Sequence, residues 1–181
     1  MAHKVLSIPI ALLFVTMIGC DGSAPLPSSG NDEINRAVVE RAAEYINARD
    51  YDRLRDVIAE DYLRHSQATP DIDVTSFDQF VEFLQQGAIL FPDDRAIFDT
   101  LVVEGDLVAF WGRYEGTNTG PGPFPTTGIA VSIEMAGLHR IEDGKIAETW
   151  VIWDNMAMFA QLGMPMVPAS PPEATQDKSP D

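Results

Sequence analysis

The stretch GLHRIEDGKIAETWVIWD, residues 137–154, contains a tight turn between two runs with the composition of β-strands. Asp143-Gly144 is a pair that favours two-residue hairpin turns. We therefore predict two antiparallel strands, Thr127–Ile141 and Ile146–Trp153, joined by this turn.

The length of the turn determines which side chains face each other. A two-residue turn pairs Glu142 with Lys145 and places His139 opposite Glu148. Asp154 then shares a face with His139 but lies roughly 20 Å from it at about 3.4 Å per residue. A three-residue turn would put His139 and Asp154 on opposite faces, so the sequence leaves their relation open.

Upstream of this hairpin the sequence predicts two more strands and three helices. Glu104-Gly105-Asp106 is typical of a hairpin turn. Ser76 with Gln79 three residues later forms a capping box, and the helix that starts there ends before Pro92. The other predicted elements are helices at Asn31–Arg49 and Tyr51–Glu60, strands at Ala96–Val103 and Leu107–Thr117, and a helical turn at Asn155–Leu162.

This order of elements predicts an α+β fold. Three N-terminal helices would pack in a curved, antiparallel four-stranded sheet with a mixed edge. The result is a cone closed at one end, and the open end of such a cone suits a small-molecule pocket.

The N-terminal residues differ in composition from the rest of the chain. Lys4 precedes an apolar run over residues 5–18, which is shorter than the about 20 residues of a membrane-spanning helix and is typical of a secretion signal. Met17-Ile18-Gly19-Cys20 resembles the lipobox of bacterial lipoproteins, in which the cysteine is lipidated. The alternative is that Cys20 is discarded with the signal.

These features divide the chain into four parts. We expect residues 1–19 to be a lipoprotein signal peptide, 20–30 a flexible tether, 31–163 the folded domain and 164–181 a disordered tail. The mature protein would then be exported and anchored through Cys20 to a membrane of the bacterial cell envelope.

The charge of the chain argues against one class of partner. With 28 acidic and 12 basic residues its net charge is -16. Phosphate backbones repel such a surface, so we expect no nucleic-acid partner.

Five motifs follow one another over residues 31–163. They are Tyr62-Leu63-Arg64-His65, WGRYEGT at 111–117, GLHRIEDGKI at 137–146, Glu148-Thr149-Trp150 followed by Asp154, and Gln161-Leu162-Gly163. Their order and spacing resemble the SnoaL-like polyketide cyclases and ester cyclases of the nuclear transport factor 2-like superfamily. The resemblance implies a cone-shaped α+β fold, and the best-known members close rings by intramolecular aldol condensation without metal or cofactor.

The resemblance also implies roles for three residues. Asp154 matches the acid/base residue, and His65 and His139 match histidines that line the pocket. Each has a simpler alternative: Asp154 caps the helical turn that begins at Asn155, His65 is an exposed loop residue, and His139 is an ordinary strand residue.

A ligand would also meet apolar side chains. Trp111 and Trp150 are the tryptophans that we expect to contact it, and the other expected contacts are Tyr62, Phe83, Phe98 and Met135. Alternation along the last strand places Asp154 on the same face as Trp150.

Two functions are consistent with these residues. The first is a cofactor-free cyclase, isomerase or hydrolyase that acts on a small apolar or aromatic carbonyl compound. The second is a non-catalytic module of the same fold that binds a small ligand or a protein partner. Related domains suggest a homodimer through the open sheet face, and no metal-ligand spacing is visible in the sequence.

Overall fold

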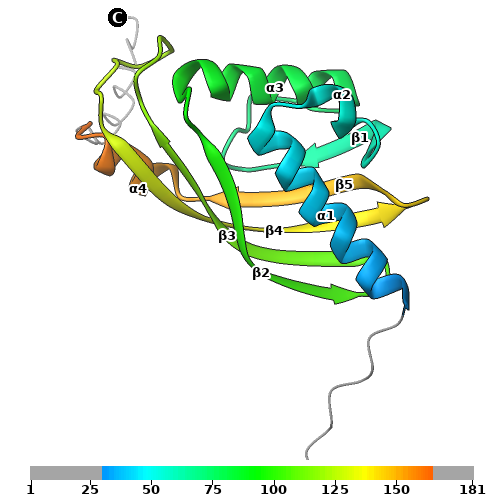
Figure 1. The fold of residues 1–181 in the computed structure, drawn as a ribbon. Helices are drawn as coiled ribbons and strands as arrows, with labels where there is room; N and C mark the ends of the chain where they lie inside the picture. The colour runs from blue at the N-terminus through cyan, green and yellow to red at the C-terminus, as the bar shows by residue number, and fades with distance from the viewer. Residues whose placement is uncertain (1–29, 165–181) are drawn as a thin grey trace, which may run out of the picture.

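One curved sheet organises the part of the chain that the computed structural model describes, residues 30–164 (Figure 1). Its five strands lie in the order β1-β5-β4-β3-β2. The strands are β1 (Ile58–His65), β2 (Arg95–Glu104), β3 (Leu107–Thr117), β4 (Ala130–Glu142) and β5 (Lys145–Trp153), and the helices are α1 (Gly30–Ala48), α2 (Tyr51–Leu54), α3 (Phe77–Leu90) and α4 (Asn155–Gln161).

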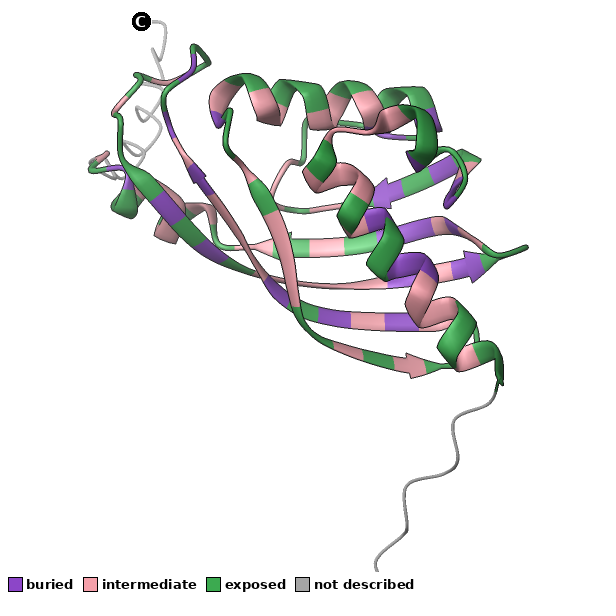
Figure 2. Ribbon diagram, viewed as in Figure 1, coloured by how far each residue is buried: buried purple, intermediate pink, exposed green. Residues whose placement is uncertain are grey.

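The helices cover one face of the sheet and leave the other open. In Figure 1, α1 crosses in front of the sheet and α3 lies above it on the side of β1. Buried residues of α1, α3 and the strands form the main core, which includes Val38, Val39, Phe77, Phe80 and Val108. Figure 2 shows the buried positions alternating along β3 and β4, as expected of strands covered on one face.

The predicted four-stranded antiparallel sheet is wrong in one respect. The expected second helix ends at Leu54, and the chain continues as β1, a fifth strand that pairs parallel to β5. The β-branched pair Val57-Ile58 is buried, and beyond it Tyr62 and Arg64 point inward while Leu63 and His65 are exposed. This two-residue alternation of burial belongs to a strand, not to the end of a helix.

The hairpin that joins β4 and β5 has the predicted turn but a different register. Asp143 and Gly144 adopt left-handed φ values of 49° and 75°, and Glu142 pairs with Lys145 as expected. The register then shifts between Arg140 and Ile141. A bulge of this kind adds one residue to β5, so His139 pairs with Thr149 rather than Glu148.

The capping of α3 is confirmed at Ser76. Its hydroxyl accepts a hydrogen bond from the Gln79 N–H at 3.3 Å. The Gln79 side chain in turn accepts from the Thr75 N–H at 2.8 Å, so the capping interaction begins one residue earlier than in a standard box.

No helix within residues 30–164 combines the length and the apolar character needed to cross a bilayer. Cys20 and the predicted signal peptide, most of the tether, and all but the first residue of the predicted tail lie outside the described residues.

Candidate functional site

A row of polar side chains crosses the inner face of the sheet beneath the helices. Thr149 on β5 is the strand partner of both His139 on β4 and Arg64 on β1. All three are buried. Because adjacent strands are about 4.8 Å apart, the row spans roughly 10 Å from the His139 backbone to the Arg64 backbone.

His139 is held by one hydrogen bond and two aromatic rings. Its Nδ1 lies 2.8 Å from the Thr149 hydroxyl oxygen. The Phe110 ring stacks on the imidazole with ring centres 4.9 Å apart and planes 21° apart, and Phe98 lies 6.1 Å away. Burial lowers the pKa of His139 to about 4, so its imidazole is neutral near pH 7.

The second ring nitrogen of His139 is free. Within residues 30–164, no group hydrogen-bonds to Nε2, although the atom is buried. A buried polar atom without a partner in a folded protein calls for an explanation, and one explanation is a ligand that supplies the partner.

Tyr62 is a second polar neighbour of Thr149. The side chain is 2 % exposed, and burial raises the pKa of its phenol to about 12, which keeps the phenol protonated. Its polar partner is Thr149. If the phenol donates to the Thr149 oxygen, the Thr149 hydroxyl donates to His139 Nδ1, and Nε2 then carries the hydrogen. In that arrangement the chain Tyr62–Thr149–His139 presents a neutral N–H donor at Nε2.

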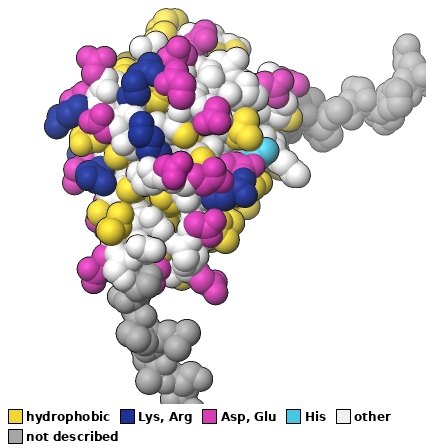
Figure 3. Space-filling view, turned by 90° about the vertical axis from the view of Figure 1, so that its right-hand side faces the viewer, with side chains coloured by type: hydrophobic (Ala, Val, Ile, Leu, Met, Phe, Trp, Pro, Cys, Tyr) yellow, Lys and Arg dark blue, Asp and Glu magenta, His cyan; other side chains and the backbone are white. Residues whose placement is uncertain are grey.

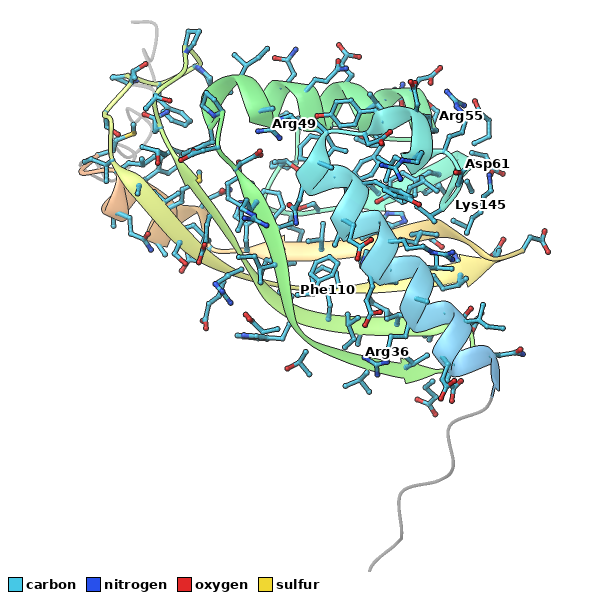
Figure 4. The ribbon with its side chains drawn as sticks, in the orientation of Figure 1. Arg36, Arg49, Arg55, Asp61, Phe110 and Lys145 are labelled. Carbon is cyan, nitrogen blue, oxygen red and sulfur yellow. The ribbon has the colours of Figure 1, made fainter. Side chains whose placement is uncertain are left out.

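A glycine makes room for the ring that covers His139. Gly137 pairs with Phe110 across β4 and β3. A Cβ atom at position 137 would lie 2.5 Å from the Phe110 ring. Figure 4 shows Phe110 projecting from β3 toward the helices.

A groove between α1 and β2 leads toward these rings. It has a volume of about 250 Å³ and is lined by Arg36, Glu40, Ala43, Phe98, Asp99 and Leu101. A second hollow of about 430 Å³ shares Ala43 and continues along α1 to Arg95. Phe98 lies between the first groove and His139, so its side chain separates the surface from the polar row.

The sheet divides the residues that the sequence suggested into two sets. Those that belong to the inner side are Tyr62, Phe83, Phe98, Met135 and His139. Three others, His65, Trp111 and Trp150, are exposed on the open outer face. The expected ligand contacts of Trp111 and Trp150 therefore find no support in this geometry. The bulge in β5 instead places Trp153 on the face that carries His139.

Asp154 is exposed at the start of α4. Its carboxylate accepts hydrogen bonds from the N–H groups of Met156 and Ala157 at 2.8 Å and 3.0 Å. This is the capping arrangement that the sequence offered as the alternative to a pocket role. Asp154 does not lie beside His139, since it continues the opposite face of β5.

His65 belongs to a separate cluster on the outer face. Its Nε2 lies 2.6 Å from a carboxylate oxygen of the buried Glu148, and its ring stacks on Trp150 at 5.3 Å. Arg140 forms an ion pair with the same carboxylate. Figure 3 shows a histidine side chain at the surface beside acidic and basic side chains.

Thr149 and Arg64 are site residues that the sequence-based reasoning missed. Both lie within the quoted motifs, but their position on the inner face follows only from the bulge in β5 and from β1 being a strand. In the described part of the chain, no group of three His, Cys, Asp or Glu side chains is arranged to hold a metal ion.

Comparisons with known proteins agree on the fold. The sequence model of a family described as SnoaL-like polyketide cyclase matches residues 36–162. IdmH from Streptomyces antibioticus, a proposed polyketide cyclase, is 30% identical, with 72% of this chain and 99% of IdmH covered and a TM-score of 0.65. AclR from Streptomyces galilaeus, a proposed hydroxylase, is 25% identical, with 76% and 87% covered and a TM-score of 0.64.

A third solved structure shows the fold alone. A proposed SnoaL-like polyketide cyclase from Jannaschia sp. CCS1 is 22% identical, with 78% of this chain and 99% of that chain covered and a TM-score of 0.69. No curated protein matches the chain.

Proposed function

The chain belongs to the SnoaL-like polyketide cyclase family, and we propose that it binds a small apolar or aromatic carbonyl compound beneath the helices and promotes its enolisation through His139. The observation that carries the proposal is the buried Nε2 of His139, which has no partner within residues 30–164. Enolisation is the first step of an aldol-type ring closure, and it needs no cofactor.

His139 would act as a neutral hydrogen-bond donor. Its lowered pKa makes the imidazole a poor base but leaves it uncharged and able to donate from Nε2. Removal of a proton α to the carbonyl creates negative charge on the carbonyl oxygen. A fixed donor in a buried site stabilises that charge, and the loss of one such donor typically slows a reaction by about 100-fold to 1000-fold.

A residue other than His139 must accept the proton that is removed α to the carbonyl. The sequence-based proposal assigns this role to Asp154, whose carboxylate caps α4. Asparagine at this position tests the role of Asp154 as proton acceptor, because asparagine is about as good an N-cap as aspartate but accepts no proton at neutral pH. Asp154→Asn therefore removes this candidate proton acceptor while it preserves the start of α4.

Exchange of the α-protons of 1-tetralone in D2O, followed by proton NMR, tests the reaction. We expect the wild-type protein to accelerate exchange and His139→Phe to lose about 100-fold of the acceleration. Circular dichroism would verify that the variant is folded. Equal exchange in both proteins would contradict the proposed role of His139. Slower exchange in Asp154→Asn would support Asp154 as the base, and unchanged exchange would exclude it.

The capping position of Asp154 favours a second candidate, a non-catalytic binding module. This function predicts that 1-tetralone binds and that His139→Phe weakens binding, while the wild-type protein leaves the exchange rate at its background value. Isothermal titration calorimetry beside the exchange assay separates the two functions.

The export and anchoring that the sequence predicts are part of the same proposal. Gly19-Cys20 after the apolar run at 5–18 supports lipidation of Cys20 in a bacterial envelope. In a bacterial host fed radiolabelled palmitate, we expect label in the wild-type chain and none in Cys20→Ser. An unlabelled wild-type chain would exclude the anchor.

The open sheet face supports a homodimer. Trp111, Trp150 and Ile152 on this face are 52%, 37% and 60% exposed, and exposed apolar side chains gathered on one face are typical of a protein–protein interface. Sedimentation analysis is expected to give a dimer that Ile152→Lys dissociates. A wild-type monomer at micromolar concentration would exclude it.

A further inference from the structure

Arg64 is a buried cation with an unusual set of neighbours. It is 8% exposed and is the only buried arginine or lysine within residues 30–164. Its guanidinium lies over two rings, 4.2 Å from the centre of Phe83 and 5.5 Å from Trp153. Its side chain donates one hydrogen bond, to the Thr69 hydroxyl at 3.0 Å.

None of the described carboxylates forms an ion pair with Arg64. The contrast is clear in a chain with 28 acidic residues, in which Arg49, Arg53, Arg55, Arg113 and Arg140 each have an acidic partner. Burial lowers the pKa of Arg64 from its ordinary value, but a guanidinium stays charged in proteins. Buried charges are normally paired, because removal from water is costly.

The position of Arg64 connects this cation to the site of the proposed function. Arg64 pairs with Thr149, which bonds His139. The two aromatic neighbours differ in origin, since Phe83 comes from α3 and Trp153 from the end of β5. The guanidinium therefore lies between the helix layer and the sheet. Arg64 is at one end of the polar row, and His139 is at the other end.

We propose that Arg64 binds an anionic group of the ligand, so that the compound held beneath the helices is a planar keto acid with its carbonyl at His139 and its carboxylate at Arg64. A guanidinium binds a carboxylate through two parallel hydrogen bonds. This inference rests on the proposed function for the carbonyl end of the ligand.

A purely structural role for Arg64 gives different expectations. As a cation that only packs on Phe83 and Trp153, Arg64 would confer no preference between charged and neutral ligands. As an anion-binding residue, it would confer a preference that depends on its charge and falls with added salt.

Two matched probes separate these roles. 6-Acetyl-2-naphthoate carries a ketone and a carboxylate at opposite ends of a flat ring system, and 2-acetylnaphthalene has the ketone alone. Calorimetric titration of the purified protein at neutral pH is expected to give binding of the acid about tenfold or more tighter than binding of the neutral ketone. Arg64→Met should remove that preference, whereas Arg64→Lys should retain part of it.

The outcomes distinguish this inference from the proposed function. Equal binding of the two probes by the wild type, or a preference that survives Arg64→Met, would overturn the role of Arg64. If Arg64→Met removes the preference but His139→Phe leaves ketone binding unchanged, Arg64 binds the anion and the role of His139 fails. Binding of neither probe overturns both.

A measurement on the wild type covers the case in which Arg64→Met does not fold. The Nε–H resonance of Arg64 should shift in proton–nitrogen NMR spectra when the acid is added, and stay in place when the neutral ketone is added. The same response to both probes would overturn the inference.

Discussion

Acidification from about pH 7.5 to about pH 5 is expected to cost the folded protein about 2 kcal/mol through His139 alone. Burial lowers the pKa of His139 from 6.5 to about 4. In the unfolded chain this imidazole titrates near its ordinary value. Between the two pKa values the unfolded chain therefore binds a proton that the folded protein does not bind.

The sign follows from this difference in bound protons. The stabilisation by neutral His139 is fully present above about pH 6.5 and is lost as the pH falls from there toward about 4. At 1.36 kcal/mol per pKa unit, the whole shift corresponds to about 3 kcal/mol, of which about 2 kcal/mol is lost by pH 5. Other groups that change protonation in this range add their own effects.

A single substitution isolates the contribution of His139 to this loss of stability. His139→Gln does not titrate but can still hydrogen-bond the Thr149 hydroxyl, and it keeps every other ionisable group. Urea denaturation followed by circular dichroism at about pH 7.5, 6.5 and 5 gives the free energy of unfolding of both proteins. The wild type should lose about 2 kcal/mol more than the variant between the highest and lowest pH. Parallel losses would refute the conclusion that His139 is buried and neutral.

Three substitutions test other parts of the account by the same denaturation assay. Gly137→Ala places a methyl group against the Phe110 ring and should cost about 1–3 kcal/mol; no loss would mean that Phe110 does not cover this position. Ser76→Ala removes the cap of α3 and should cost about 1 kcal/mol, with Ser76→Asp as a near-neutral control. Glu148→Leu removes the carboxylate that pairs with His65 and Arg140, although Arg140 keeps its ion pair with Glu142 at 3.3 Å, and should cost about 1–3 kcal/mol, discounted because both partners are partly exposed; an unchanged stability would show that the outer cluster adds no net stability.

The hairpin and the helix start were predictable because the relevant signals are local. Asp143-Gly144 adopts the left-handed turn that this pair favours, and Ser76 caps α3 through Gln79. The strand β1 was missed for the opposite reason. Its neighbour is β5, about 85 residues later, and a short run that follows a helical pattern carries no local sign of such pairing.

The site was predictable only in part because one residue of register changes the face of every side chain that follows. A two-residue turn without a bulge would place His139 opposite Glu148, but the bulge places it opposite Thr149. Because of the same shift, the tryptophan of β5 that shares a face with His139 is Trp153, not Trp150. A bulge depends on how the whole sheet curves, so the hairpin sequence alone does not show it.

The infrared carbonyl stretch of bound 1-tetralone reports whether a donor in the site polarises the carbonyl. In the wild-type protein the stretch should move to lower wavenumber than in an apolar solvent, and in His139→Phe it should return toward the solvent value, while Asp154→Asn leaves it at the wild-type position. A stretch that is the same in the wild type and in His139→Phe would contradict the assignment of His139 as the group that binds the carbonyl.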